Sequence, residues 1–242
     1  MKTGLFFIPL AGLLLANAAQ AAVCQNVNGA PTTVDYDLST TLTAAQNAAG
    51  NTVQLTKNQE VNVQAVCPAG SAFSNRTYRS YVSPYAVVET SGPWKYLKLD
   101  PDYLEGAMRI DDSAAGTLYL PTNYAYMGTD DSVNAGKPFY IRDSNLVFQL
   151  KIARPFVGTV TITPKTMFNV YVTTGTSDPL SNVVYNIAYS GTVTVPQSCE
   201  INAGQTILVD FGSLYSGGFN RAGAKPVSVR NKKFRVPVKC SG

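Results

Sequence analysis

Three segments of this sequence combine aromatic rings with polar side chains, which is the combination that a carbohydrate site needs. Ring faces pack against the apolar side of a sugar, and Asp, Asn or Arg side chains form hydrogen bonds with its hydroxyl groups. The alternative is that these rings are core residues or cross-strand pairs, the usual role of aromatic side chains in sheets. On residue type and spacing, the candidate sugar-binding residues are Asn75, Arg79, Trp94, Asn123, Tyr124, Tyr126, Asp130 and Asn134.

Catalytic and metal chemistry have much weaker support in the sequence. The 242 residues include no His, which removes the commonest general base and the commonest metal ligand. The acidic pairs Asp111-Asp112 and Asp130-Asp131 lack the alternating oxygen ligands of a calcium loop, so we interpret them as turn residues. Adjacent carboxylates on a strand also point to opposite faces. We therefore expect no enzyme activity, no cofactor and no metal site.

The composition indicates an exported all-β protein, with 45% hydrophobic and only 14% charged residues, 14 Tyr and 19 Gly. The net charge of +4 is uneven, because residues 23–198 carry 11 basic and 13 acidic side chains and residues 199–242 carry 7 and 2. In that last segment Lys233, Arg235 and Lys239 alternate with apolar residues, as on the solvated face of one strand. No nucleic-acid partner is expected.

Residues 1–21 have the composition of a secretory signal peptide. Lys2 supplies a short positive region, residues 5–16 are apolar but too few to span a bilayer, and residues 19–21 fit a small-residue cleavage site. Cleavage is expected after Ala21 or Ala22. We expect the mature protein in an oxidising compartment, where disulfides persist.

Alternating apolar residues and turn signals predict short strands throughout the mature chain. The clearest strand-like runs are 146–152, 158–163, 168–173, 183–189 and 192–195. Shorter strand-like pieces are 86–89, 118–120 and 139–141. Pro196 ends the last run, and residues 101–106 allow one helical turn at most. The pattern predicts an all-β fold, with an antiparallel β-sandwich of immunoglobulin-like or jelly-roll lectin type over residues 22–195.

The four cysteines predict two disulfides. Four Cys allow three pairings, of which the sequential one, Cys24–Cys67 and Cys199–Cys240, is the simplest. Each bond would close a loop of about forty residues and stabilise the fold by about 4 kcal/mol in the chain-entropy model. No C-x-x-C motif is present, so a zinc site is not expected.

Two C-terminal stretches resemble a known family. YNIAYSGTVTVPQSC at residues 185–199 runs into SCEINAGQ and VDFG, and FRVPVKC ends at Cys240. Together they resemble the domain junction of chaperone–usher fimbrial tip adhesins, in which a lectin domain is followed by a pilin domain stapled by a Cys pair. The resemblance implies a lectin-like domain over residues 22–195. Only 44 residues remain from Cys199 to Gly242, whereas an immunoglobulin-type domain needs about 100 residues. We therefore expect residues 196–242 to be a truncated pilin domain with its first strands only.

The resemblance also implies one residue of the sugar site. Family members have an acidic residue in the loop before the last lectin strand, and Asp178 stands there in this chain. Mannose-binding members begin with an aromatic residue and have an Asn-Asp pair after the second Cys, whereas this chain has Ala22 or Val23 and Pro68-Ala69-Gly70. Mannose specificity is therefore not expected to carry over. We expect a tip pocket formed by the loop after Cys67, residues 122–134 and residues 173–179.

The functional expectation is a fimbrial adhesin subunit at a pilus tip. Its implied partners are a host-cell glycan or glycoprotein, a periplasmic chaperone, the outer-membrane usher and an adjacent pilus subunit joined by donor-strand complementation. The implied location is the fimbrium at the bacterial cell surface, reached through the periplasm. The alternative is a structural minor fimbrial subunit, an adaptor or terminator without sugar binding. The tip position is favoured because one or two residues before Cys24 are too few for a donor strand.

Overall fold

The structure is a computed structural model that describes residues 23–57, 61–69, 75–141, 143, 145–201, 222, 233, 235–236 and 238–241. The expected signal peptide, residues 1–21, lies outside the described residues, as does most of the truncated pilin domain expected over residues 196–242. The expected domain boundary at 195–196 remains a prediction.

Eighteen elements are described, of which seventeen are strands. The elements before residue 113 are β1 (Gln25–Asn26), β2 (Thr32–Asp37), β3 (Thr40–Thr41), β4 (Thr52–Lys57), β5 (Val63–Val66), β6 (Arg76–Val82), β7 (Glu89–Ser91), β8 (Trp94–Lys98) and β9 (Leu104–Asp112). The later elements are β10 (Gly116–Leu120), β11 (Thr122–Thr129), α1 (Asp131–Asn134), β12 (Phe139–Ile141), β13 (Leu146–Ile152), β14 (Gly158–Thr173), β15 (Tyr185–Val195), β16 (Ser198–Ile201) and β17 (Val238–Ser241). The chain is all-β, as the sequence predicts.

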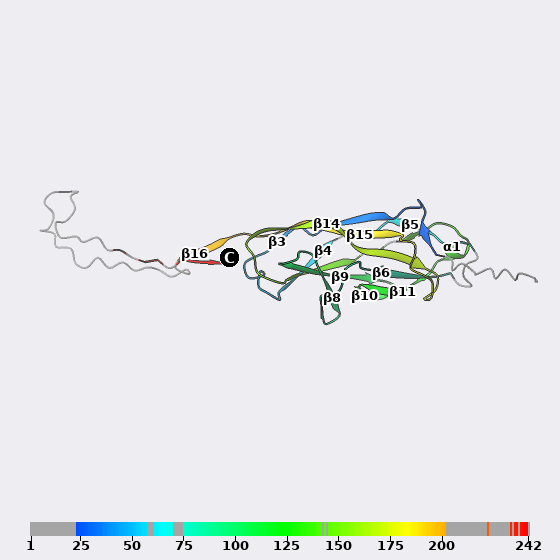
Figure 1. Ribbon diagram of the computed structural model, residues 1–242, viewed down its shortest axis with the longest axis horizontal. Helices are drawn as coiled ribbons and strands as arrows, with labels where there is room; N and C mark the ends of the chain where they lie inside the picture. Colours follow the sequence, from blue (N-terminus) through cyan, green and yellow to red (C-terminus); the bar gives the residue numbers. More distant parts are fainter. Residues whose placement is uncertain are drawn as a thin grey trace, which may run out of the picture.

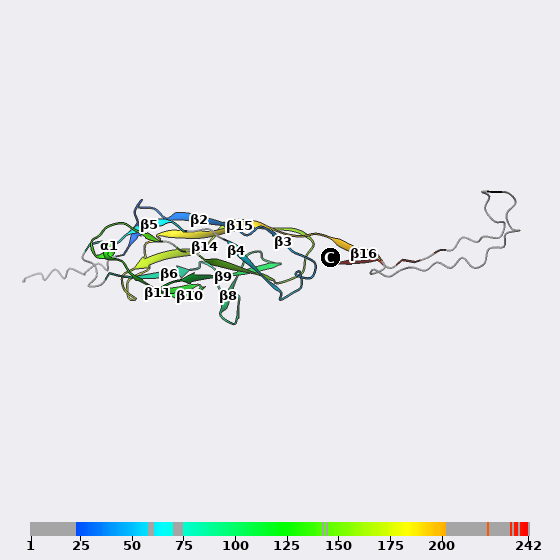
Figure 2. The same ribbon diagram turned by 180° about the vertical axis from the view of Figure 1, so that it is seen from behind.

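Two six-stranded sheets form the sandwich. The β14 sheet has the order β11-β6-β14-β15-β2, with β3 also on β15, and the β13 sheet has the order β4-β13-β9-β8-β7, with β10 also on β9. A third, small sheet, β1-β5-β12, lies at the end of the sandwich where α1 is found, and Figures 1 and 2 show this end opposite to β16. We call it the α1 end.

The core lies between the two sheets and follows from period-2 alternation. On β13, Leu146, Phe148 and Leu150 are buried in the core, and Phe148 packs against Tyr36 and Tyr189 with ring centroids 5.1 and 5.0 Å apart. Burying one such side chain stabilises a fold by about 1.5–3 kcal/mol.

Several local features differ from the expectation. The expected runs 158–163 and 168–173 form one strand, β14. Pro164 has no amide hydrogen to donate, and β-bulges on either side of Lys165 let the strand continue past it. Strands β2 and β3 pair with β15 in parallel, so the sandwich is not purely antiparallel. The short helix is α1 rather than a turn in 101–106, and residues 86–88 are not in a strand.

Both predicted disulfides are confirmed. Cys24 and Cys67 are fully buried, with their sulfur atoms 2.03 Å apart, at the α1 end. Cys199 and Cys240 join β16 to β17, where they lie directly opposite each other.

Candidate functional site

The structure places the three loops named as a tip pocket together at the α1 end. A Cβ on Gly136, just after α1, would lie 2.8 Å from the Cβ of Ala69, so the segment after β11 packs on the loop that follows Cys67. The Tyr124 hydroxyl donates a hydrogen bond of 2.8 Å to the Asp178 carbonyl, which joins β11 to the loop between β14 and β15. These two contacts thus link the segment 122–136 to each of the other two loops.

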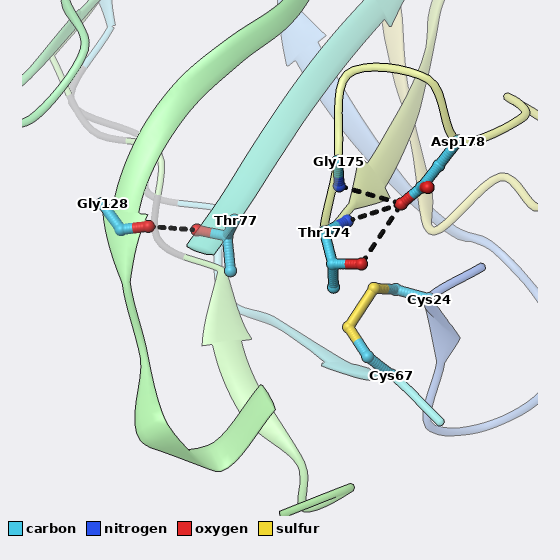
Figure 3. The surroundings of a disulfide bond; sticks show 7 residues. All are labelled: Cys24, Cys67, Thr77, Gly128, Thr174, Gly175 and Asp178. Atoms are coloured by element: carbon cyan, nitrogen blue, oxygen red, sulfur yellow. Dashed lines mark hydrogen bonds between the residues drawn. A yellow bond between two sulfur atoms is a disulfide. The ribbon is translucent and has the colours of Figure 1, made fainter. Parts of the chain in front are cut away.

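Asp178 organises its own loop with one carboxylate oxygen. Its Oδ2 accepts hydrogen bonds from the Thr174 amide (3.0 Å), the Thr174 hydroxyl (3.2 Å) and the Gly175 amide (2.9 Å), and Figure 3 shows this loop beside the Cys24–Cys67 bond. Among the described residues, no group donates a hydrogen bond to Oδ1. The side chain is half-buried, and Oδ1 is the second acceptor oxygen of this fixed carboxylate.

Tyr124 has an unusual backbone that directs its side chain across the sheet. Its φ is +52°, in the left-handed region that non-glycine residues rarely adopt. It lies within the β11 bulge, where its amide donates to the Ser80 hydroxyl at 2.8 Å while its own hydroxyl reaches Asp178. Because both ends of the residue are bonded, the ring is fixed beside the Asp178 loop.

Asn75, Asp130 and Asn134 lie around α1. The Asn75 amide group donates to Asp131 Oδ1 at 2.6 Å, and the Asp130 backbone amide donates to the Asn75 carbonyl at 2.8 Å. Asp130 caps α1 by accepting from the Ser132 amide. Asn134 ends the helix and is exposed. Most of these polar groups hold the loop in shape.

Arg79 is not placed at this surface, which corrects its selection as a sugar ligand. Its side chain points between the sheets, is 8% exposed and forms an ion pair with Asp143. The hydroxyls of Tyr81 and Tyr185 donate to the other oxygen of the same carboxylate. Burial raises the pKa of Tyr81 and of Tyr185. A buried cation needs such a partner, so the role of Arg79 is a buried ion pair with Asp143 in the core.

Trp94 also lies away from the three loops. It begins β8, in the β13 sheet, and Figure 1 shows β8 apart from the α1 end. Its ring meets Tyr119 edge-on at 5.1 Å, and the Arg109 guanidinium lies 5.9 Å from its centroid. These contacts account for Trp94 as part of a cross-strand aromatic group.

Asn123 and Tyr126 are exposed on β11. Tyr126 lies directly opposite Tyr78 on β6, with ring centroids 5.5 Å apart. This pair lies on the outer face of the β14 sheet.

Sequence reasoning missed the groups that position the site. Thr174 and Gly175 donate to Asp178 in a local turn, and the nearby Asp-Pro dipeptide is a signal that could have pointed to them. Ser80 and Asp143 act at long range in the sequence, and no local pattern indicates either contact.

Of the two acidic pairs, Asp112 caps the turn after β9 and Asp130 caps α1, whereas Asp111 lies within β9 and Asp131 within α1. Asp112 Oδ1 accepts from the Ala114 and Ala115 amides, both at 2.8 Å. Among the described residues no group of three His, Cys, Asp or Glu side chains could hold a metal ion. Nor does that part of the chain contain a helix of the length and apolarity required to cross a membrane.

Comparisons with known proteins identify the family. Residues 187–242 match the family model described as "Fimbrial protein". Over 232 residues, the chain is 50% identical to the "Type 1 fimbrin D-mannose specific adhesin" of Salmonella typhimurium, an alignment that covers 95% of this chain and 69% of that protein. It is 26% identical to the "Probable minor fimbrial subunit LpfD" of Escherichia coli O157:H7, over 82% of this chain and 58% of that protein.

Among solved structures, the receptor-binding domain of the adhesin MrkD1P of Klebsiella pneumoniae aligns with a TM-score of 0.39 at 12% identity, over 77% of this chain and 99% of that chain. The half-identical relative and the family match agree with the junction motif around Cys199. The chain belongs to the family of fimbrial tip adhesins.

Proposed function

We propose that this adhesin binds a host-cell glycan through the surface at the α1 end, with Asp178 as the principal hydroxyl acceptor. The observation that carries the proposal is the half-buried Asp178 carboxylate, of which one oxygen is fixed by three hydrogen bonds, while the Asp178 carbonyl accepts from the Tyr124 hydroxyl. The surface lies at the opposite end of the sandwich from β16, after which the proposed pilin domain would continue. A glycan bound there would be held away from the fibre.

D-mannose is the first sugar to test. The half-identical Salmonella relative is named as D-mannose specific. The sequence argued against mannose at two places only, the mature N-terminus and Pro68-Ala69-Gly70. Identity at half of 232 positions outweighs two local differences, so we propose a terminal mannoside as the ligand class.

The proposed assembly follows the family. The chain would be secreted through the periplasm, bind a chaperone and the outer-membrane usher, and join the next subunit by donor-strand complementation. It would act at the cell surface by adhesion without catalysis. The similarity to a minor fimbrial subunit favours a second candidate, a structural subunit that binds no sugar.

The test is calorimetric titration of the full exported chain with methyl α-D-mannoside, together with a glycan array. The expected result is saturable binding that falls at least tenfold in Asp178→Asn, equivalent to about 1.4 kcal/mol. Asp100→Asn is the matched control, because Asp100 also fixes a turn with one carboxylate oxygen. Its Oδ1 accepts hydrogen bonds from the Asp102 and Tyr103 amides. Absence of binding to every glycan would favour the structural subunit.

A further inference from the structure

Residues 84–88 form an exposed apolar segment in the connection from β6 to β7. All five are exposed, and Tyr85, Val87 and Val88 are 41%, 39% and 45% exposed. Three large apolar side chains thus lie at the surface within four positions, and such clusters are typical of interaction surfaces. We call residues 84–88 the apolar edge segment.

The apolar edge segment leads into an open edge of the β13 sheet. β7 is the last strand of that sheet, and it pairs with β8 on one side, where Thr90 lies opposite Lys95. Figures 1 and 2 both place β8 on the flank of the sandwich, between the α1 end and β16. The segment therefore adjoins a sheet edge that is separate from the proposed sugar site and from the pilin junction.

Both ends of the segment are held in place. The Tyr85 amide donates to the Ser83 hydroxyl at 3.0 Å, and the Tyr85 ring lies 5.1 Å from the ammonium of Lys165. That ammonium is itself fixed by two backbone carbonyls at the end of β8. At the other end, the Val88 amide donates to the Tyr96 carbonyl at 2.9 Å. The segment is therefore ordered before any partner arrives.

Between these anchors, Ala86 and Val87 have free backbone groups. Within the described part of the chain, neither amide donates a hydrogen bond and neither carbonyl accepts one, and residues 86–88 contain no turn or bend. The Val88 amide faces β8, and successive residues of an extended chain direct their backbone groups to opposite sides. The Val87 amide and carbonyl therefore face the open side, where they can pair with another strand.

Three other edge strands of the two large sheets carry features that oppose such pairing. β2 exposes Asp35 and Asp37, β4 ends in Lys57, and β11 is interrupted by two register shifts. Residues 85–88, in contrast, include no charge and no proline. The edge before β7 is thus suited to pairing, and its partner must be an apolar, uncharged strand.

A second copy of this chain supplies a strand with these properties. In a two-fold antiparallel pair, Val87 of one copy lies opposite Val87 of the other, and Ala86 lies opposite Val88. The first charged residue, Glu89, then lies opposite Tyr85 and already has an ion-pair partner in its own chain. The two Glu89 positions are four residues apart along the strands, or about 14 Å, beyond the screening length of about 8 Å. No like charges oppose the pairing.

We propose that the apolar edge segment is a self-association surface through which two copies of this chain pair edge to edge at Val87 and join their β13 sheets. The contact is short, so the pair forms reversibly and its population depends on concentration. Both α1 ends stay free, so a pair presents two adhesive ends and gains avidity on a surface with many receptors. The pairing itself does not depend on the proposed glycan-binding function.

The test is sedimentation equilibrium of the full exported chain over a series of concentrations, and the expected result is a reversible monomer–dimer equilibrium. Val87→Pro removes the free amide and keeps an apolar side chain, and Val87→Lys adds a charge at the centre of the contact. Each is expected to weaken dimer formation at least tenfold. Val157→Lys is the matched control, because Val157 is 42% exposed and outside the segment. Unchanged thermal unfolding by circular dichroism shows that each variant is folded.

Hydrogen exchange gives a second readout on the unmodified chain. The Val87 amide is free in the single chain and bonded in the pair, so its exchange should slow as the dimer fraction rises. Loss of the dimer in both Val87 variants but not in Val157→Lys supports the proposal. A wild-type chain that stays monomeric at every concentration overturns it. So does a dimer that persists in Val87→Pro, that is lost equally in Val157→Lys, or that leaves Val87 exchange unchanged.

Discussion

The Tyr124 hydroxyl and the Asp178 carbonyl are joined by a hydrogen bond of 2.8 Å between residues 54 positions apart. This bond connects β11, on the edge of the β14 sheet, to the loop that leads into β15. Two segments of the proposed site therefore share one contact, and changes in either should affect both.

Tyr124→Phe is expected to lower the free energy of unfolding by about 0.5–1.5 kcal/mol, because one part-buried hydrogen bond is lost while the ring is kept. Urea unfolding measures this. Methyl mannoside binding should weaken as the Asp178 loop loses its tie to β11. Tyr126→Phe is the control, and an equal effect of both variants would contradict the role of this bond.

Asp178→Asn and Asp178→Ala should differ in stability. Asn retains one carbonyl oxygen that can accept from Thr174 and Gly175, so the loop should persist with little loss. Ala removes the acceptor from all three donors and should cost about 1.5–3 kcal/mol, the usual value for hydrogen bonds to a charged group. Thermal unfolding of the two variants tests this, and equal stability would mean that the carboxylate does not order the loop.

Asp143→Ala is expected to destabilise the fold by about 3–5 kcal/mol, because it leaves the Arg79 cation buried without a partner. The double variant Arg79→Met with Asp143→Leu should recover much of that loss, since no buried charge remains. A double-mutant cycle by urea denaturation measures the coupling. Additive losses would show that the pair is not energetically coupled.

Stability should fall in alkaline solution. Burial raises the pKa of Tyr36, Tyr81, Tyr185 and Tyr189 above the ordinary value of about 10. The unfolded chain therefore loses these protons at lower pH than the folded chain does, so their contribution is complete below pH 10 and declines as pH rises further.

The measurement is tyrosinate absorbance recorded with circular dichroism. The four buried tyrosines should ionise in the same step in which the sheet signal is lost. Tyr36→Phe should move that step to higher pH at little cost near neutrality, because the buried Tyr36 hydroxyl has no hydrogen-bond partner in the described part of the chain. An unchanged alkaline midpoint would contradict this.

Replacing both Cys24 and Cys67 by Ser should lower the free energy of unfolding by about 4 kcal/mol, because the bond closes a loop with a sequence separation of 43. Replacing Cys199 and Cys240 by Ser should leave the unfolding of residues 22–195 unchanged if the domain boundary lies at 195–196. A comparable loss in both double variants would place the second disulfide in the same cooperative unit.

Local patterns predicted both disulfides and the strands from β12 to β15, whereas β2, β4, β6, β9 and β11 were not among the predicted runs. Alternation identified residues 146–152 and 192–195, and spacing identified the Cys pairs. The single bent β14 was not predicted, because whether Pro164 ends a strand or sits in a bulge depends on the partner strand. Parallel pairing of β2 with β15 joins segments about 150 residues apart, beyond any local signal.

The sequence predicted which segments of the candidate site meet better than it predicted which side chains lie there. The loops around Tyr124 and Asp178 do meet, whereas Arg79 faces the core. A strand arginine is predicted to be exposed unless a buried partner is known. The partner of Arg79, Asp143, lies 64 positions away in the sequence, so it was not identified. Sheet register decides which way such a side chain points, and composition does not fix register.

Strand β15 gives the sandwich a direction of mechanical strength. It runs from Tyr185, near the α1 end, to Val195, next to the segment that leads to β16. It is paired along its length with β14 on one side and with β2 and β3 on the other. A pull on Pro196 against an anchored glycan therefore loads these two ladders in shear, so that many hydrogen bonds share the force instead of opening one by one.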